Sequence, residues 1–318
     1  MNDMLTTFGQ FLVTLGKRHP EILVLDADLN SSTKTNLFME EFPDRFIQLG
    51  IAEQNMIGVA AGLSLAERYI TFPTTFATFA SKRVCDQISV SVAYQGANVK
   101  IIGAYAGISI SKGGATHQSI EDLAIMRAIP GINIAEPGWP AEVEEVLEAA
   151  VAHTGPVYIR LSAGSFPDLS FESGFEWGKG RVFEEGKDCT IITTGIMIHQ
   201  SLAAMKQLRE EGIAAGLVHL SSIEPFDQEL VNHVANESSS VITVENHGIN
   251  GGLGDAVSRV VCESRPIPMV RIGLNRSFGQ TARSTEDLFR KHHMTAIDIV
   301  EAARFLTKKN RGNLNAEI

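Results

Sequence analysis

The chain has 318 residues, of which 44% are hydrophobic and 20% charged, and its formal net charge is −10 at pH 7. This length allows two globular domains with buried cores. The negative charge, without any basic run, argues against nucleic acid or an anionic membrane as a partner. No apolar run is long enough to span a bilayer, and the N-terminus does not resemble a signal peptide, so we expect a cytoplasmic protein. The three cysteines lie far apart and lack the spacing of a metal site.

The first half of the chain alternates short apolar runs with helical patterns. We predict strands at 22–25, 46–49, 69–72, 99–103, 132–134 and 157–160. Helices are predicted near 5–17, 56–63, 76–92, 119–128 and 140–152. This alternation indicates a parallel sheet covered on both faces. The strand at 46–49 is expected to be buried, and the small residues of 56–63 are expected to form a closely packed helix.

The second half repeats this alternation after a segment that differs in composition and lacks periodicity. Residues 166–187 are rich in Gly, Ser, Phe, Pro and Glu without periodicity, and we interpret them as a linker. Strands are predicted at 190–193, 216–219, 241–244 and 269–272, with helices near 198–212, 227–237, 252–263, 285–292 and 295–306. The predicted fold class is therefore α/β, with two mostly parallel α/β sandwich domains at 1–165 and 188–318.

One stretch, Gly50-Ile51-Ala52-Glu53-Gln54-Asn55-Met56, joins a predicted strand to a predicted helix. Glu53 then lies at the carboxyl edge of the sheet, where open α/β folds bind their ligands. A carboxylate between an apolar strand and an apolar helix is costly unless something pairs with it. A simpler role, in which Glu53 interacts with the dipole of its own helix, stays equally open on this stretch alone.

Two aromatic residues and a glycine-rich loop are further candidates. Phe76 and Phe79 are one helical turn apart, so both rings can face the same way, although large apolar residues are more often core. Residues 106–118 form a loop too long for a simple connection, which indicates a functional segment. His117 ends this loop at the carboxyl side of a strand, where it is placed for proton transfer. A plain surface role for His117 stays open.

A second glycine-rich stretch, Gly251-Gly252-Leu253-Gly254, follows a strand and opens a helix. It is not the GxGxxG pattern of a dinucleotide site, so a tight turn that lets the helix pack closely is favoured over a phosphate site. His247 lies at the end of the same strand. It faces a site or has a structural role, and the sequence does not decide between them.

The motifs GIAEQNM, FATF and GGATHQ, in that order, resemble the transketolase superfamily of thiamin-diphosphate-dependent enzymes. The resemblance is to the pyrimidine-binding domain plus the C-terminal domain and covers nearly the whole chain. Supporting stretches are LDADL at 25–29, THQSIED at 116–122 and PGIN at 130–133. The THQ and IED pair followed by IP is closer to transketolase than to deoxyxylulose-phosphate synthase or the β-subunits of 2-oxo-acid dehydrogenases.

The resemblance implies roles for these residues. Glu53 matches the glutamate that hydrogen-bonds N1′ of the cofactor's aminopyrimidine and promotes loss of the thiazolium C2 proton. Phe76 and Phe79 match the aromatic residues that stack around the pyrimidine ring, and Asp28 matches an acid near the cofactor. His117 matches a histidine at the reacting oxygens of the substrate. Burial of Glu53 suits its role, because burial raises the proton affinity of a carboxyl group.

The resemblance also implies a partner subunit. Family members hold the diphosphate through Mg²⁺ on a Gly-Asp-Gly motif and a distant Asn in another domain, and this sequence contains no Gly-Asp-Gly. We therefore expect no metal ligand here, and an α2β2 assembly with an N-terminal-type transketolase subunit that carries the diphosphate and Mg²⁺ site. The implied reaction moves a two-carbon ketol unit from a ketose to an aldose. The alternatives are a decarboxylating enzyme with a 2-oxo acid donor and a non-catalytic regulatory subunit.

Several positions depart from the transketolase pattern. Tyr105 stands where transketolase has a histidine, and Gly113 stands where it has an acid. Leu5 and Ala163 align with arginines that bind sugar phosphate in the family. Together these losses predict a substrate unlike ordinary ketose phosphates, or one held by other groups. We expect small sugars or sugar phosphates as substrates. The expected contacts are His117, Tyr105 and Arg160, with Lys34, Lys82 and Lys112 as further candidates, although surface lysines are usually only solvated.

Overall fold

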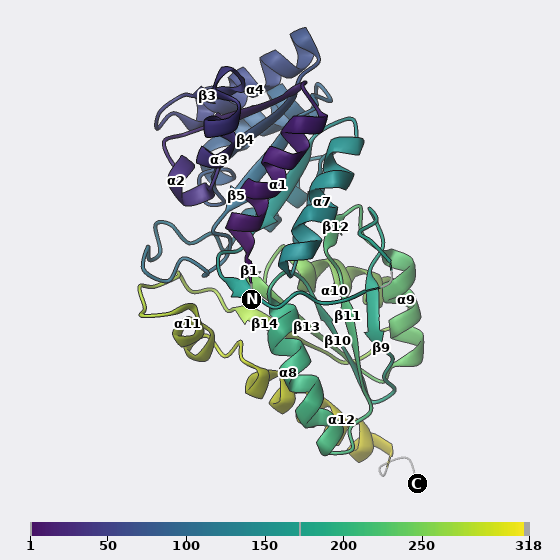
Figure 1. Cartoon of the computed structure of the whole chain (residues 1–318). Helices are drawn as coiled ribbons and strands as arrows, with labels where there is room; N and C mark the ends of the chain where they lie inside the picture. The colour runs from purple at the N-terminus through teal and green to yellow at the C-terminus, as the bar shows by residue number, and fades with distance from the viewer. Residues whose placement is uncertain (1, 172, 315–318) are drawn as a thin grey trace.

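The computed structural model describes residues 2–171 and 173–314. The chain forms two α/β units stacked end to end, each built on its own sheet, as Figure 1 shows. In the part of the chain described, no helix is both long and apolar enough to cross a membrane.

The first unit is built on a seven-stranded sheet in the order β12-β6-β7-β5-β4-β2-β3. Neighbouring strands are parallel except for β12, which runs antiparallel to β6. The strands are β2 (Ile22–Asp26), β3 (Phe46–Gln48), β4 (Ile70–Phe76), β5 (Lys100–Ala104), β6 (Asn133–Ala135), β7 (Val157–Leu161) and β12 (Ser222–Glu224). The inner strands are buried along their whole length because helices cover both faces.

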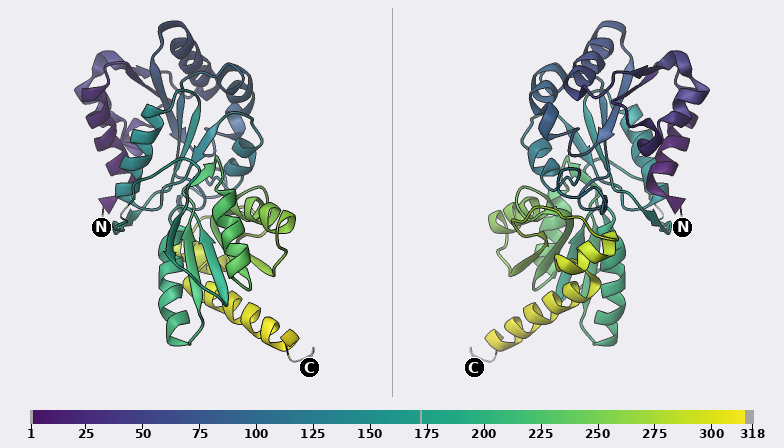
Figure 2. Two further views of the ribbon diagram at one scale, coloured as in Figure 1. Left: turned by 90° about the vertical axis from the view of Figure 1, so that its right-hand side faces the viewer. Right: turned by 90° about the vertical axis from the view of Figure 1, so that its left-hand side faces the viewer.

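Helices lie on both faces of this sheet (Figure 2), and an apolar core fills the space between the helices and the sheet on each face. Helices α1 (Met4–Arg18) and α7 (Pro140–Ala152) pack on one face. The other face is covered by α4 (Glu53–Glu67), the π-helical segment η3 (Ile88–Ala93) and α6 (Asp122–Arg127). Shorter helical turns complete the unit: α2 (Asn30–Thr33), α3 (Asn36–Glu41), η1 (Pro43–Arg45), η2 (Lys82–Val84) and α5 (Cys85–Gln87).

Three details of this unit differ from the predictions. The strand expected to be buried, β3, is partly exposed because it lies at the edge of the sheet beside β2. Phe76 ends β4 instead of starting a helix, since the Thr- and Phe-rich run ITFPTTF continues the strand. Gly58 and Gly62 of α4 face open space, so this helix is not closely packed on that side.

The second unit contains a five-stranded sheet in the order β14-β13-β10-β11-β9, parallel except for the edge strand β9. Its strands are β9 (Arg181–Glu184), β10 (Cys189–Thr193), β11 (Ala215–His219), β13 (Val241–Gly248) and β14 (Met269–Leu274). Its helices are α8 (Met197–Glu210), α9 (Gln228–Glu237), α10 (Leu253–Glu263), α11 (Thr285–Lys291) and α12 (Ala296–Leu314). The predicted class, two α/β domains with mostly parallel sheets, is confirmed.

Short strands near the junction were missed by the sequence patterns. β8 (Ser165–Phe166) pairs antiparallel with β1 (Asn2–Asp3), and β9 lies inside the predicted linker, where it pairs with β11. β12, from the second half of the chain, crosses over to the first sheet. These strands are two to four residues long and partly polar, so they lack the apolar run that marks a buried strand.

Arg160 lies at the junction of the two units and is fully buried. Its Nε donates to Oδ2 of Asp122 at 2.7 Å, Nη1 pairs with Glu136, and Nη2 donates to the main-chain oxygen of Asn246 in β13 at 2.9 Å. Burial by itself would raise the pKa of Asp122, but the guanidinium outweighs it and lowers that pKa below its usual value. Because all three guanidinium nitrogens bind protein groups, the expectation that Arg160 contacts substrate is corrected: it joins the domains.

We predict that Arg160→Met lowers the free energy of unfolding by about 3–5 kcal/mol, because it leaves two buried carboxylates without their cation. Urea unfolding measures this loss. The matched control is Arg209→Met, whose ion pair with Glu184 is solvent-exposed and should cost at most about 1 kcal/mol. Equal losses in the two variants would show that the buried cluster does not stabilise the junction.

Candidate active site

The predicted site residues come from the carboxyl edge of the first sheet. Phe76 is the last residue of β4, Tyr105 follows β5, and Glu53 begins α4 shortly after β3. In a parallel sheet these strand ends meet at one edge, which is where open α/β sheets bind ligands. The topology therefore brings together residues that are far apart in the sequence.

Glu53 is buried, with 3% of its side chain exposed, and its Oε1 accepts a hydrogen bond from Nη1 of Arg83 at 2.6 Å. Together with Arg83 and its own neighbours, it lines a cavity of about 500 Å³. The carboxylate also lies in the first turn of α4, at the positive end of the helix dipole. The sequence predicted that a buried Glu53 carboxylate needs a partner, and Arg83 of the same chain is that partner.

Arg83 was not predicted as a site residue. Its guanidinium carbon lies 4.1 Å from the centre of the Phe79 ring, so one cation contacts both Glu53 and the aromatic residues. The only sequence signal for it was the spacing of four residues between Phe79 and Arg83, and this spacing is informative only if the local backbone is known.

Four of the predicted residues form one aromatic group. The Phe76 and Phe79 rings are stacked, with centroids 5.9 Å apart and planes 18° apart, although a turn and not a helix places them. The Tyr105 ring lies 4.7 Å from Phe76, and the His117 ring lies edge-on to Phe79 at 5.5 Å. These ring contacts therefore connect the end of β4 to Tyr105, just before the loop at 106–118, and to His117, near its end.

Tyr105 has an unusual backbone conformation in this group. Its φ is +57°, a left-handed conformation that is uncommon for a bulky residue and is often found at functional sites. The hydroxyl donates a hydrogen bond to the main-chain oxygen of Ser32 at 3.4 Å. Burial, and then the nearby Asp3 carboxylate, raise the pKa of the Tyr105 hydroxyl, so Tyr105 is neutral at physiological pH.

The other predicted residues lie nearby but outside the aromatic group. Asp28 is exposed after β2, and its N–H donates to Oε1 of Gln48 at 2.9 Å. Lys82 forms an ion pair with Glu121 at 2.6 Å, whereas Lys112 is exposed on the loop. Asp28 therefore shares the sheet edge with the group, while the charge of Lys82 is already paired.

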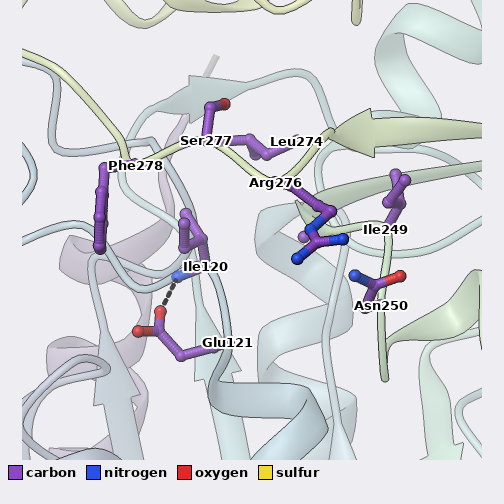
Figure 3. Close-up of a pocket in the computed structure, with 9 residues that line it drawn as sticks. Ile120, Glu121, Ile249, Asn250, Leu274, Arg276, Ser277 and Phe278 are labelled. Atoms are coloured by element: carbon purple, nitrogen blue, oxygen red, sulfur yellow. Dashed lines mark hydrogen bonds between the residues drawn. The ribbon is translucent and has the colours of Figure 1, made fainter.

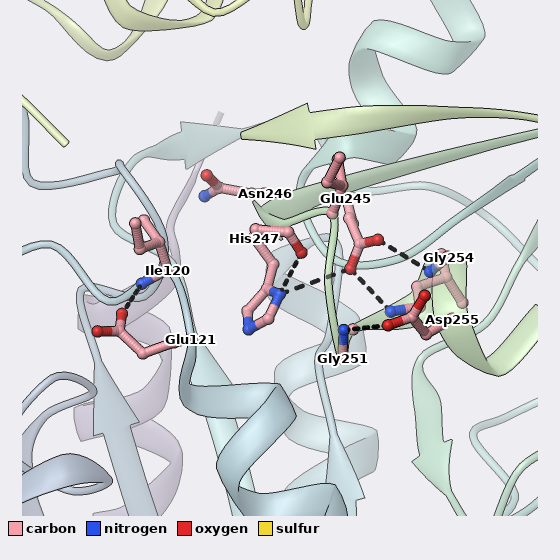
Figure 4. Close-up of polar contacts among 12 residues, drawn as sticks. Ile120, Glu121, Glu245, Asn246, His247, Gly251, Gly254 and Asp255 are labelled. Atoms are coloured by element: carbon pink, nitrogen blue, oxygen red, sulfur yellow. Dashed lines mark hydrogen bonds and ion pairs between the residues drawn. The ribbon is translucent and has the colours of Figure 1, made fainter. Parts of the chain in front are cut away.

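In the glycine-rich turn before α10, the main-chain N–H groups donate hydrogen bonds to the carboxylate of Glu245. Glu245 accepts hydrogen bonds from the N–H of Leu253 at 2.7 Å and of Gly254 at 2.8 Å, as Figure 4 shows. A Cβ atom at Gly252 would lie 1.9 Å from Oε2 of Glu245, so this close approach requires glycine. The packing interpretation of the motif is confirmed over the phosphate-site alternative.

His247 has a structural position beside this turn. It is fully buried, and its Nδ1 donates to the main-chain oxygen of Gly248 at 2.7 Å (Figure 4). Burial lowers its pKa to about 4, so the imidazole is neutral at physiological pH. These observations favour the structural interpretation of His247.

A separate cavity of about 250 Å³ lies between the two domains. Figure 3 shows Ile120 and Glu121 of the first domain on one side of it and residues of the loops after β13 and β14 on the other. None of the side chains predicted to be catalytic or to bind the cofactor lines this cavity. We therefore place the candidate active site at the sheet edge beside Glu53.

Known proteins share this arrangement. Residues 1–167 match the family model of the transketolase pyrimidine-binding domain, and residues 178–299 match that of the transketolase C-terminal domain. The chain belongs to the transketolase family. This confirms the resemblance inferred from the motifs, and it identifies the two halves as the pyrimidine-binding and C-terminal domains of transketolase.

The transketolase relatives include separate subunits of similar length. The chain is 40% identical over 304 residues to the 6-deoxy-6-sulfo-D-fructose transketolase subunit SqwH of Clostridium sp. (strain MSTE9), covering 95% of this chain and 94% of that one. It is 41% identical over 283 residues to a putative transketolase C-terminal section of Methanocaldococcus jannaschii, covering 88% of each. A solved structure described as "split gene transketolase, inactive beta4 tetramer" has a TM-score of 0.88 at 43% identity, covering 97% and 99% of the two chains.

Proposed function

We propose that this chain is the pyrimidine-side subunit of a split thiamin-diphosphate-dependent transketolase, which transfers a two-carbon ketol unit from a ketose to an aldose. The observation that carries the proposal is the buried Glu53 carboxylate, joined through Arg83 to the stacked Phe76 and Phe79 rings, within a transketolase fold. Relatives named as transketolase subunits support group transfer over the decarboxylating alternative.

The residues at the sheet edge fit an aminopyrimidine. Arg83 is bonded to Oε1 of Glu53, so Oε2 is left for a ring nitrogen, and the Phe76 and Phe79 rings offer aromatic surface for stacking. Glu53 would hold a proton at N1′, and Asp28 would lie near the cofactor. When bound, the cofactor supplies the electron sink for carbon–carbon bond cleavage. His117 would hold or move a proton at the substrate's reacting oxygens.

A partner subunit would complete this site with the diphosphate and Mg²⁺ ligands, in an α2β2 assembly in the cytoplasm. An exposed apolar surface along the adjacent segments α4 and η3 supports this proposal. Ile51 is 75% exposed, Leu65 of α4 is 50% exposed, and Tyr94 after η3 is 84% exposed. Large apolar side chains grouped on a surface are typical of interfaces. The relative whose β chains alone form an inactive tetramer also supports a role for a second kind of subunit.

Assembly can be tested by calorimetry. We expect the purified chain to bind thiamin diphosphate weakly, and the mixture with its partner and Mg²⁺ to bind it tightly. Leu65→Asp should abolish the complex, because it places a charge within the apolar surface. Phe305→Asp is the matched control, since Phe305 is also well exposed (60%) but lies on α12 in the other domain. Tight, stoichiometric cofactor binding by the isolated chain would refute the split-enzyme proposal.

The substrate is proposed to differ from ordinary pentose phosphates. Leu5, which replaces a phosphate-binding arginine, is buried in the core, and Tyr105 replaces a histidine within the aromatic group. Relatives are named for varied sugars: one for a sulfonated ketose and two for apulose 4-phosphate. Small sugars other than the ordinary pentose phosphates therefore fit the proposal best.

A substrate panel with the reconstituted complex tests this proposal. It should include phosphorylated, sulfonated and unmodified ketoses, with pyruvate as the donor for the decarboxylating alternative. We expect xylulose 5-phosphate with ribose 5-phosphate to be used poorly. Tyr105→His should raise this activity relative to the best substrate, whereas Tyr69→His, outside the site, should not. Efficient use of the pentose phosphates by the wild type would show that other residues replace the missing contacts.

The role of Glu53 is tested by Glu53→Gln, with hydrogen–deuterium exchange at the cofactor's C2 measured in the reconstituted complex. The amide cannot hold or share a proton at N1′, so exchange should fall about a hundredfold or more. His117→Ala should slow turnover but leave this exchange unchanged. If the carboxylate only stabilised the helix end, Glu53→Gln would cost on the order of 1 kcal/mol of stability and exchange would stay at the wild-type rate.

Glu142→Gln is the matched control for Glu53→Gln. Glu142 is also a buried carboxylate in the first turn of a helix, and it pairs with Arg181. Glu142 follows β6, far from β3 in the strand order, and it contacts Arg181 and His219 instead of the Glu53 group. Its substitution should therefore lower the urea midpoint and leave C2 exchange unchanged. Wild-type exchange in Glu53→Gln would return Glu53 to a purely structural role.

A further inference from the structure

The loop at 106–120, which carries His117, is held by main-chain and side-chain groups of the C-terminal domain. Figure 1 shows this loop beside the segment that precedes α11. The cross-domain hydrogen bonds join Asn246 to Ile108 (3.0 Å) and Ala106 (3.4 Å), Thr285 to Ser109 (3.1 Å), Ala282 to Ser111 (3.0 Å), Gln118 to Gln280 (2.9 Å) and Gly248 to Ile120 (2.8 Å). They are spread along the whole loop.

Asn246 binds the start of the loop. Its side chain is fully buried, Oδ1 accepts from the N–H of Ile108, and Nδ2 donates to the main-chain oxygen of Ala106. Gly107 lies between these two residues with a φ of +62°, and a Cβ atom there would lie 2.3 Å from the Asn246 amide. This glycine is therefore required by the approach of the C-terminal domain and does not indicate a free loop.

The middle and end of the loop are bound by the segment before α11. The Thr285 hydroxyl donates to the main-chain oxygen of Ser109, and the Ala282 N–H donates to that of Ser111. A Cβ atom at Gly114 would lie 2.7 Å from the hydroxyl of Thr281. At Gly107 and Gly114, groups of the C-terminal domain therefore occupy the space that a side chain would need.

We propose that Asn246 and Thr285 are positioning residues, through which the C-terminal domain fixes the loop so that His117 stays against Phe76 and Phe79. A glycine-rich loop that ordered only on substrate binding would lose conformational entropy at that step. Ordering the loop in advance avoids this loss and keeps the imidazole close to its productive geometry. The kinetic consequence of this inference rests on the proposed transketolase function, but the loop's order does not.

The test uses Asn246→Leu and Thr285→Val in the full chain. In the chain alone, amide hydrogen exchange of residues 107–118 should become about tenfold faster or more, because cross-domain hydrogen bonds are lost. In the reconstituted complex, kcat should fall roughly tenfold to a hundredfold, the size expected when a catalytic group is misplaced by about 1 Å. C2 proton exchange, which depends on Glu53, should stay unchanged.

One further variant separates positioning from general damage. Thr307→Val makes the same atomic change as Thr285→Val, but the Thr307 hydroxyl bonds within α12 to Ala303, so loop exchange and kcat should not change. If Asn246→Leu fails to fold, loop exchange and kcat of Thr285→Val still test the positioning proposal.

Unchanged loop exchange and unchanged kcat in folded Asn246→Leu or Thr285→Val would overturn the positioning proposal. The wild-type complex could lack transketolase activity while the variants still show faster loop exchange. That result would contradict the proposed function but support the positioning proposal. A drop in C2 exchange equal to the drop in kcat would also overturn the proposal, because it would show damage to the whole site.

Discussion

The buried ion cluster of Arg160, Asp122 and Glu136 is the interaction on which the rest of the arrangement depends. It joins β7, β6 and α6 of the pyrimidine-binding domain, and Nη2 of Arg160 extends it to the main chain of Asn246 in the C-terminal domain. The same Nη2 donates to the main-chain oxygen of Ser119, at the end of the loop that carries His117. A buried cation of this kind is useful for geometry more than for net stability, because desolvation offsets most of the attraction between the charges.

The parallel order of the first sheet is the second constraint on the site. It places the ends of β4 and β5 and the start of α4 at one edge, so Glu53, Phe76 and Tyr105 meet although they are far apart in sequence. Arg83 then joins the carboxylate to the aromatic group through one hydrogen bond and one ring contact. The chemistry thus depends on strand order, while the loop geometry depends on the neighbouring domain.

Local sequence patterns predicted what depends on local chemistry. The buried strands and the helices were recognisable because their apolar residues repeat with a clear period. Partners supplied by distant segments were not predictable: Arg83 for Glu53, Asp122 and Glu136 for Arg160, and Glu245 for the turn before α10. Arg160 was misassigned for this reason, since an arginine after a strand looks the same in sequence whether it meets a substrate or a buried carboxylate. The family motifs predicted Glu53, Phe76, Phe79 and His117 as site residues, because their spacing carries information that the physics of one chain does not.

The division of roles among the parts of this chain agrees with a split enzyme. Glu53, the aromatic group and His117 all belong to the pyrimidine-binding domain, so the side chains proposed to act on the pyrimidine and substrate are positioned within one chain. Among the described residues, the hydrogen bonds from the C-terminal domain reach the loop and the buried junction. A partner therefore does not have to order these side chains. In the proposed assembly, the partner would cover the apolar surface along α4 and bring the diphosphate ligands to a sheet edge whose side chains are already in place. Because Ile51, at one end of that surface, lines the Glu53 cavity, covering it would also exclude water from the site.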